Sequence, residues 1–315
     1  MLEAASNLIG TELDPVSTPA VERLLDRAGL GGEARFPIAF LGGGTLINSG
    51  YIDIVETCLD QGIALATLGT GVGSSGFHDK ESRLDPRWAD ALRRFKSVGV
   101  RGPRSLKKMR SIGIDRAEIV GDLAMALTPD SPVADWNGRK LIFNTCAGRS
   151  SDDANVLQAF DRSIAPVLCE LHKSGWQIIP VAFHSSDIDP IRQVLEQIAL
   201  ADIPIARPAT FTDYVCLAQG AALSISVRLH GSVLASMCGV PGLLLGYRDK
   251  CYDFAESIGS DASVLDYRQT SEDLLRARIA EMVDDLEATG KSVHARCLRY
   301  RSRLQAYVAS LRRTS

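Results

Sequence analysis

The sequence has no hydrophobic run approaching the ~20 residues that a membrane-spanning helix needs, and its first residues lack a basic start followed by an apolar core. It also has no long basic run, and its formal net charge is -3. The positive surface that nucleic-acid binding requires is therefore missing. We expect a cytoplasmic protein with no transmembrane segment and no nucleic-acid partner; peripheral association with a membrane stays open.

Cysteines are few and scattered. The chain has seven, an odd number, and no Cys-x-x-Cys pair, which argues against both a disulfide framework and a zinc knot. No cluster of histidine, cysteine and aspartate has the spacing of metal ligands. We expect free, mostly buried thiols, no metal and no cofactor.

Apolar, β-rich runs alternate with helical patterns, which is typical of βαβ units around a parallel sheet. Strands are expected at 37–41, 64–68, 98–101, 141–144, 178–182, 203–206, 223–227 and 243–246. Helices are expected from Pro86 to Phe95 and over 152–174, 271–286 and 293–311. The pattern predicts an α/β fold.

Residues 128–140 are rich in proline and aspartate and have no apolar periodicity, which indicates a linker. We place an N-terminal Rossmann-like domain at 1–132 and a C-terminal one, with terminal helices, at 136–315. Open parallel sheets bind ligands at the carboxyl ends of their strands, so candidate residues are sought there.

Two glycine-rich segments follow predicted strands. The first, Leu41–Asn48, contains Gly43, Gly44, Thr45 and Asn48. Glycines let backbone N–H groups approach a ligand closely, although a turn needed only for packing has the same composition.

The second segment contains Gly71, Gly73 and Gly76, which formally satisfy the spacing of a dinucleotide-binding motif. The residues that follow, Phe77 to Arg83, are polar and loop-like, whereas that motif needs an amphipathic helix there. Nicotinamide or flavin binding is therefore disfavoured, and Gly71 and Gly73 are kept as substrate-binding candidates.

Arginine and histidine stand at strand ends. Arg101 ends the strand at 98–101 and suits bidentate capture of a carboxylate or phosphate; an inter-domain salt bridge is the other interpretation. Arg228 and His230 follow the strand at 223–227 and are expected on one side of an extended segment, beside a helix N-terminus that attracts anions. Lys250, after the last strand, is expected to face the same ligand, or else to be a solvated loop charge.

Two weaker candidates are His184, with Asp187 beside it, and Asp122. His184 follows the strand at 178–182 and is a candidate substrate-binding residue. Asp122 fits a helix cap as well as a ligand contact.

The motifs GGGT (42–45), GTGVG (69–73), VRGPRSL (100–106), VGDLAMAL (120–127), RLHGSVLASMCGVP (228–241) and YRDK (247–250) occur in that order. Together they resemble the polysaccharide pyruvyl transferase family, in its bacterial exopolysaccharide branch. The resemblance implies a GT-B-like pair of Rossmann-type domains that transfers pyruvyl from phosphoenolpyruvate to two sugar hydroxyls as a cyclic ketal. It places Arg101, Arg228, His230 and Lys250 on phosphoenolpyruvate and the glycine-rich segments on the acceptor side.

The start of the chain departs from that family. Its members usually open with a strand and an Asn-x-Gly-Asp motif, and Gly10–Pro15 is at best a degenerate form of it. We therefore expect either a truncated start, with a first domain that lacks its initial strand, or a first domain that is rebuilt.

The residues suit this chemistry because phosphoenolpyruvate carries a carboxylate and a phosphate on three carbons and needs several fixed cations. His230, with an ordinary pKa of ~6.5, is the candidate acid for C3 of the enol. Arg101 and Arg228 would hold the anionic groups, and Lys250 the departing phosphate. The acceptor would be a nucleotide-linked or lipid-linked saccharide. Two alternatives stay open: a GT-B glycosyltransferase that uses a nucleotide sugar, and a non-catalytic saccharide-binding partner.

Overall fold

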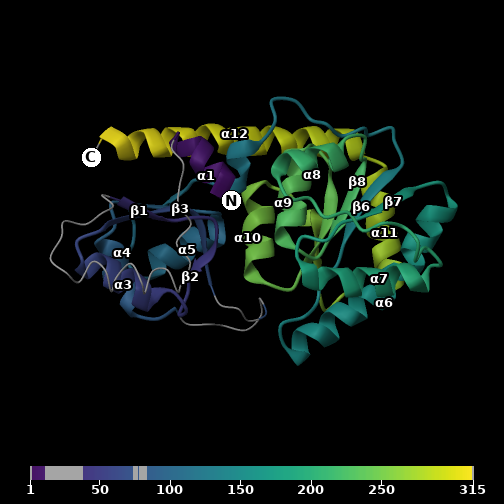
Figure 1. Cartoon of the computed structure of the whole chain (residues 1–315), viewed down its shortest axis with the longest axis horizontal. Coiled ribbons are helices and arrows are strands. Elements are labelled where there is room, and N and C mark those ends of the chain that lie inside the picture. The colour runs from purple at the N-terminus through teal and green to yellow at the C-terminus, as the bar shows by residue number, and fades with distance from the viewer. Residues whose placement is uncertain (1, 11–37, 74–76, 78–83, 314–315) are drawn as a thin grey trace. The chain divides into compact units, whose positions relative to one another are not determined.

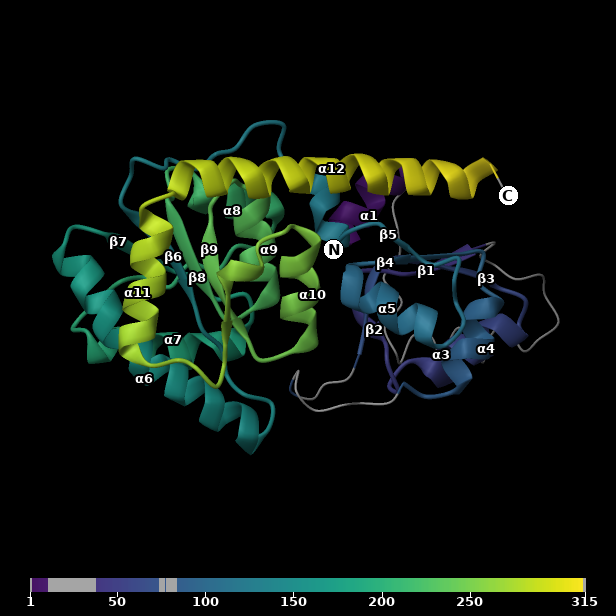
Figure 2. The ribbon, with the colours of Figure 1, turned by 180° about the vertical axis from the view of Figure 1, so that it is seen from behind.

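The computed structural model describes residues 2–10, 38–73, 77 and 84–313, and it divides the chain into two units (Figures 1 and 2). Unit 1 comprises Met1–Ala126, Arg248–Ser257 and Arg299–Ser315. Unit 2 comprises Leu127–Tyr247 and Ile258–Leu298. The units differ from the predicted domains of 1–132 and 136–315, because two late segments fold with unit 1.

Unit 1 is built on a parallel sheet whose strand order is β1-β3-β4-β5, with β2 also paired to β3. Its strands are β1 (Ile38–Leu41), β2 (Gly44–Ile47), β3 (Ala64–Val72), β4 (Ser97–Val100) and β5 (Glu118–Ile119). Three helices cover one face of the sheet in Figure 1: α3 (Ile52–Asp60), α4 (Arg87–Arg93) and α5 (Pro103–Ser111). The apolar side chains between them and the sheet, Trp88 and Leu92 among them, form the core.

Both glycine-rich segments are mostly strand rather than loop, which corrects the sequence-based expectation. Gly44–Ile47 is β2, and Gly69 to Val72 are the last residues of β3. Gly69 has a φ of +67°, at a register shift of the β3–β4 ladder. Glycine tolerates that conformation, so the strand continues through it.

Two tyrosines of α12 (Leu286–Arg313) complete unit 1 by packing on Gly99 of β4 and on Gly121, which follows β5. A Cβ atom at Gly121 would lie 2.6 Å from the Tyr300 ring, and one at Gly99 would lie 2.8 Å from the Tyr307 ring. The Tyr307 hydroxyl also donates to the carbonyl of Thr67 at 3.0 Å. Burial of this phenol raises its pKa to about 12.

Unit 2 contains a parallel sheet whose strand order is β10-β9-β8-β6-β7. Its strands are β6 (Lys140–Asn144), β7 (Gln177–Pro180), β8 (Leu223–Ser226), β9 (Gly242–Gly246) and β10 (Val264–Asp266). Its helices are α6 (Ser151–Lys173), α7 (Ile188–Gln197), α8 (Phe211–Ala218), α9 (Leu229–Met237) and α11 (Glu272–Val283).

The chain reverses its direction of progress across the unit 2 sheet between β6 and β8. The crossover through α6 leads from β6 to β7 at one edge, whereas the crossover through α9 leads from β8 to β9 toward the other. Right-handed crossovers put these two helices on opposite faces. Such a switch point leaves a crevice at the carboxyl ends of the two central strands, where ligands bind in open α/β sheets.

Several predicted elements changed in extent. The strand expected at 203–206 is reduced to one bridge between Val181 and Ala206, whereas the helix expected over 152–174 is confirmed as α6, which contains Pro166. The degenerate motif at Gly10–Pro15 lies, apart from Gly10, outside the described residues. The described residues before it form not a strand but the helix α1 (Leu2–Ile9). None of the described helices is long and apolar enough to cross a membrane.

Candidate functional site

Asn144, the last residue of β6, ties together the two neighbouring strand ends of unit 2. Its Oδ1 accepts the backbone N–H of Arg228 at 3.0 Å, and its Nδ2 donates to the carbonyl of Val181 at 2.9 Å. The Ser226 hydroxyl donates to the carbonyl of Arg228 at 2.8 Å. Buried side chains therefore fix the backbone at the switch point. Sequence reasoning missed this role of Asn144, whose only signal was that a polar residue ends an apolar strand.

The guanidinium of Arg228 is held by the carboxylate of Asp187. Nε of Arg228 lies 3.2 Å from each carboxylate oxygen of Asp187, and Nη2 also donates to Oδ1. The Asp187 side chain is fully buried, whereas that of Arg228 is 25% exposed. Burial alone lowers the pKa of Arg228, but Asp187, Cys146 and Tyr247 outweigh it and raise that pKa.

The same carboxylate of Asp187 organises the loop after β7. Its Oδ2 accepts the backbone N–H groups of Phe183 and His184 at 3.2 and 3.1 Å. The His184 ring is exposed and its Nδ1 lies 2.8 Å from the Ser186 hydroxyl. The predicted candidate His184 is thus placed at the same sheet edge as Arg228, and Asp187 links the two.

His230 lies close to Arg228 in the chain but not on an extended segment. Arg228 is the N-cap of α9, and His230 is the second residue of that helix and is half-buried. The expected strand-like alternation of these two side chains is therefore wrong, because the chain turns into the helix at Leu229. Both residues still stand at the N-terminus of α9, where the helix dipole favours an anion.

Lys250 and Arg101 belong to unit 1, whereas Arg228 and His230 belong to unit 2. Lys250 is the second residue of α10 (Asp249–Ser257) and is half-exposed. The four predicted phosphoenolpyruvate ligands are thus divided equally between the two units.

Arg101 is buried in an ion pair within unit 1. Its Nε lies 2.9 Å from Oδ2 of Asp122, and the two side chains are 1% and 0% exposed. Nη2 donates to the carbonyl of Gly44, and Nη1 has no hydrogen-bond partner within the described part of the chain. The other oxygen of Asp122 accepts the N–H of Ala124 at 3.1 Å, so Asp122 both caps a 3₁₀ turn and holds Arg101.

The acceptor-side candidates of unit 1 have different environments. Asn48 uses its side chain within its own turn, where Nδ2 donates to the Thr45 carbonyl at 2.5 Å and Oδ1 accepts the Gly50 N–H at 2.8 Å. The Thr45 hydroxyl is buried without a partner among the described residues. Gly43 is half-buried between β1 and β2.

Gly71 and Gly73 give room to basic side chains. A Cβ atom at Gly71 would lie 2.6 Å from Nη1 of Arg101, so this glycine makes space for the guanidinium. A Cβ atom at Gly73, where φ is +154°, would lie 3.4 Å from Nζ of Lys108. Gly71 therefore has a packing role that the sequence did not reveal.

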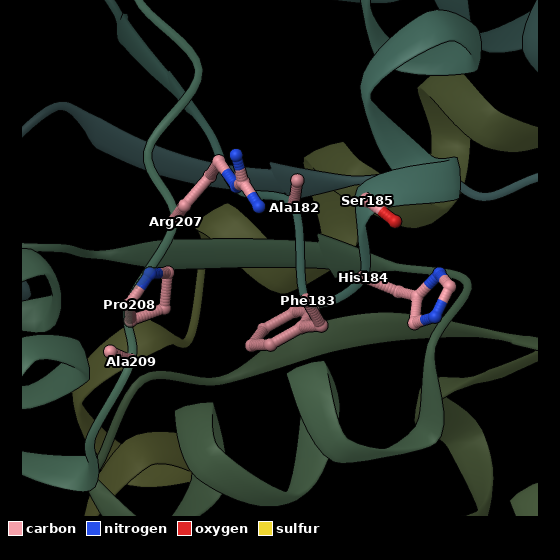
Figure 3. A pocket seen from close by; sticks show the side chains of 7 residues that line it. All are labelled: Ala182, Phe183, His184, Ser185, Arg207, Pro208 and Ala209. Atoms are coloured by element: carbon pink, nitrogen blue, oxygen red, sulfur yellow. The ribbon is translucent and has the colours of Figure 1, made fainter.

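A pocket of about 450 Å³ opens beside the loop after β7 in unit 2 (Figure 3). Arg207 and Pro208 line one side of it and His184 the other, with Phe183 between them. The Arg207 side chain is exposed and pairs with no acid among the described residues. The sequence analysis did not single out Arg207, which follows the strand expected at 203–206, and so it did not predict this pocket.

A second buried carboxyl, that of Asp161 on α6, lies near the same strand ends. It accepts a hydrogen bond from the Thr145 hydroxyl at 2.7 Å. Burial raises its pKa to about 7, and the Thr145 bond only partly opposes that shift. In the described residues, no group of three or more histidine, cysteine, aspartate or glutamate side chains is arranged to hold a metal ion.

The profile of one protein family, described as polysaccharide pyruvyl transferase, matches residues 17–249. The chain belongs to the polysaccharide pyruvyl transferase family. This match covers Arg101, Arg228 and His230 and extends to Asp249, one residue short of Lys250. No curated protein matches the chain.

Solved structures similar to this pyruvyl transferase family member are nucleotide-sugar enzymes with the GT-B fold. UDP-GlcNAc 2-epimerase from Neisseria meningitidis, bound to UDP-GlcNAc, has a TM-score of 0.65 at 13% identity and covers 99% of this chain and 88% of its own. A putative UDP-N-acetylglucosamine 2-epimerase from Listeria monocytogenes has a TM-score of 0.61 at 13% identity and covers 93% of this chain and 80% of its own. The S. aureus MnaA–UDP structure has a TM-score of 0.60 at 13% identity and covers 94% of this chain and 81% of its own. At this identity they show the shared GT-B-like fold and nothing about substrates.

Proposed function

We propose that the chain transfers the pyruvyl group of phosphoenolpyruvate to two hydroxyls of a saccharide, forming a cyclic ketal and releasing phosphate. The two hydroxyls lose two protons in total. C3 gains one proton and becomes a methyl group, and the other proton leaves with phosphate. The two hydroxyl oxygens form the new bonds to C2, and the bond from C2 to the phosphate oxygen breaks. The reaction needs no oxidant or reductant.

The observation that carries the proposal is the placement of Arg228 and His230 together at the N-terminus of α9 in a chain of this family. An arginine beside a helix N-terminus is suited to a carboxylate or phosphate. The Arg228 side chain is 25% exposed, so part of it is accessible to solvent. In the described conformation Arg101 is buried, and the proposal therefore relies on Arg228, rather than Arg101, as the arginine that contacts the donor.

His230 is proposed as the acid that protonates C3 of the enol while a sugar hydroxyl attacks C2. An imidazole both gives and accepts protons near neutral pH. Lys250 is proposed to neutralise the departing phosphate, a role that rests on the family resemblance.

The pocket beside Phe183 and Arg207 is proposed to take part of the saccharide acceptor. An aromatic ring, an arginine and an imidazole offer both a stacking face and donors for hydroxyl or phosphate groups. Two of the fold neighbours were solved with UDP or UDP-GlcNAc, and a nucleotide-linked acceptor is therefore the first one to test.

The test is to incubate the protein with phosphoenolpyruvate and nucleotide-linked or lipid-linked saccharides, measuring phosphate release and the ketal methyl signal by NMR. We expect phosphate and ketal to form in equal amounts and only when both substrates are present. Phosphate without ketal, or neither product with every acceptor, would contradict the proposal.

A GT-B glycosyltransferase is the second candidate, since the solved neighbours include UDP complexes. A ligand that binds the folded state raises the free energy of unfolding, by ~2.7 kcal/mol when its concentration is one hundred times Kd, and the unfolding temperature rises with it. Stabilisation by phosphoenolpyruvate supports the pyruvyl transferase, whereas transfer of sugar from UDP- or GDP-sugars supports the glycosyltransferase. Saccharide binding with no turnover at all would indicate a non-catalytic partner.

A further inference from the structure

We infer that Asp187 is a positioning residue that fixes the guanidinium of Arg228 for the anionic donor. The inference rests on the proposed function, because it concerns how the same site holds phosphoenolpyruvate. Asp187 has no role in the reaction steps proposed above; it contacts the guanidinium of Arg228 and would act through it.

Asp187 binds only some of the N–H donors of Arg228. A guanidinium has five N–H donors in a fixed planar fork. Asp187 takes the edge formed by Nε and Nη2. Nη1 meets no acceptor among the described residues, so the edge that includes Nη1 is the one left for a ligand.

Asp187 is itself held in place by burial and hydrogen bonds. Its side chain is fully buried, and its Oδ2 is fixed by the N–H groups of Phe183 and His184. The backbone of Asp187 directly precedes α7, whose Ile191 and Val194 are buried. A long, partly exposed arginine is thereby held in one orientation before the ligand arrives, which lowers the ordering cost of binding.

The charge of Asp187 weakens anion binding by Arg228, whereas the orientation that Asp187 imposes on the guanidinium strengthens it. The carboxylate of Asp187 cancels the positive charge of Arg228, so its removal should increase the attraction for an anion. If binding weakens despite that gain, orientation rather than charge is what Asp187 provides. The direction of the change therefore separates the two roles.

The decisive variant is Asp187→Asn in the full-length chain. Asparagine keeps an oxygen that can accept the N–H groups of Phe183 and His184, but it loses the charge-assisted bonds to Arg228. We expect the KM for phosphoenolpyruvate to rise about tenfold or more, since a hydrogen bond to a charged group is lost, while kcat changes far less. Partial unfolding would instead lower the apparent kcat and leave KM unchanged.

Asp161→Asn is the matched control, because Asp161 is another largely buried carboxyl of unit 2 that bonds a hydroxyl and not Arg228. We expect it to leave the KM for phosphoenolpyruvate within about twofold of the wild-type value. An equal rise in KM in both variants would overturn the inference, as would an unchanged KM in Asp187→Asn.

A second measurement does not depend on turnover. The ¹⁵N–¹H signal of the Arg228 Nε group, identified by its loss in Arg228→Lys, should be sharp and slow to exchange in the wild type and should broaden or vanish in Asp187→Asn. An Nε signal that survives unchanged in the variant contradicts the inference. A wild type that shows the protected signal but releases no phosphate from phosphoenolpyruvate would leave the positioning of Arg228 supported and the proposed function refuted.

Discussion

The guanidinium of Arg101 and the carboxylate of Asp122 form an ion pair in which neither side chain is more than 1% exposed, with 2.9 Å between Nε and Oδ2. It joins the residue after β4 to the turn after β5. Removal of one partner from such a pair leaves a charge buried without compensation, whereas removal of both leaves none.

The Asp122→Ala variant should therefore lose about 3–5 kcal/mol of unfolding free energy. The double variant Arg101→Met/Asp122→Leu should lose clearly less than the sum of the losses in the single variants Arg101→Met and Asp122→Leu, because neither charge of the pair is left without its partner. Urea unfolding of Asp122→Ala, of these two single variants and of the double variant measures both effects. Strictly additive losses would show that the two side chains do not interact.

Gly71 should be intolerant of a side chain. Its missing Cβ makes room for Nη1 of Arg101, which would lie 2.6 Å away, so Gly71→Ala should cost about 1–3 kcal/mol through overpacking. Gly42→Ala is the control, because a Cβ there would meet only Leu123 at an ordinary 3.6 Å. Comparison of the thermal midpoints tests this, and equal midpoints for both variants would contradict it.

Asp161 should make unit 2 less stable as pH rises. Burial raises its folded-state pKa to about 7 from an ordinary 3.8. Between these values the folded chain binds more protons than the unfolded chain, so the unfolding free energy falls with rising pH, by up to about 4 kcal/mol, and levels off above pH 7.

Asp161→Asn removes this titrating group, so the unfolding free energy of the variant should depend less on pH between 4 and 7 than that of the wild type. Unfolding curves of the wild type and the variant at pH 5 and pH 8 measure the difference. The stability gap between the two proteins should change with pH; a constant gap would mean that Asp161 titrates normally.

His230→Ala should lower the rate of phosphate release by ~10²–10⁴ if His230 is the proton donor. Binding of phosphoenolpyruvate should change little, because Arg228 and the α9 N-terminus remain. Phosphate release with the acceptor present, together with a thermal shift by phosphoenolpyruvate, separates the two effects. Release at the wild-type rate would assign the proton to another group.

Strand-end positions were predictable from the sequence, because apolar runs that end in polar residues mark the carboxyl edge of a parallel sheet. That pattern located Arg228, His230 and His184 at the edge of unit 2. The family was likewise evident from the order of the motifs, and the profile match confirms it.

The partners of those residues were less predictable. Nothing in the spacing of Arg101 and Asp122 indicates that they pair, and the pairing depends on two neighbouring strands ending at the same level. Asp187 was noted beside His184, but its bond to Arg228 spans 41 positions. The glycines of β2 and β3 suggested loops. Their actual roles, room for Arg101 at Gly71 and the register shift at Gly69, depend on tertiary structure and could not be predicted from the sequence.

The tyrosines of α12 have a consequence for how the protein is made. Tyr300 and Tyr307 fill the spaces above Gly121 and Gly99, so the sheet nearest the start of the chain remains uncovered on that side until residues 299–313 leave the ribosome. Unit 2, apart from its own last helical turns, is complete before then. The second-encoded unit should thus gain protease resistance earlier in synthesis than the first.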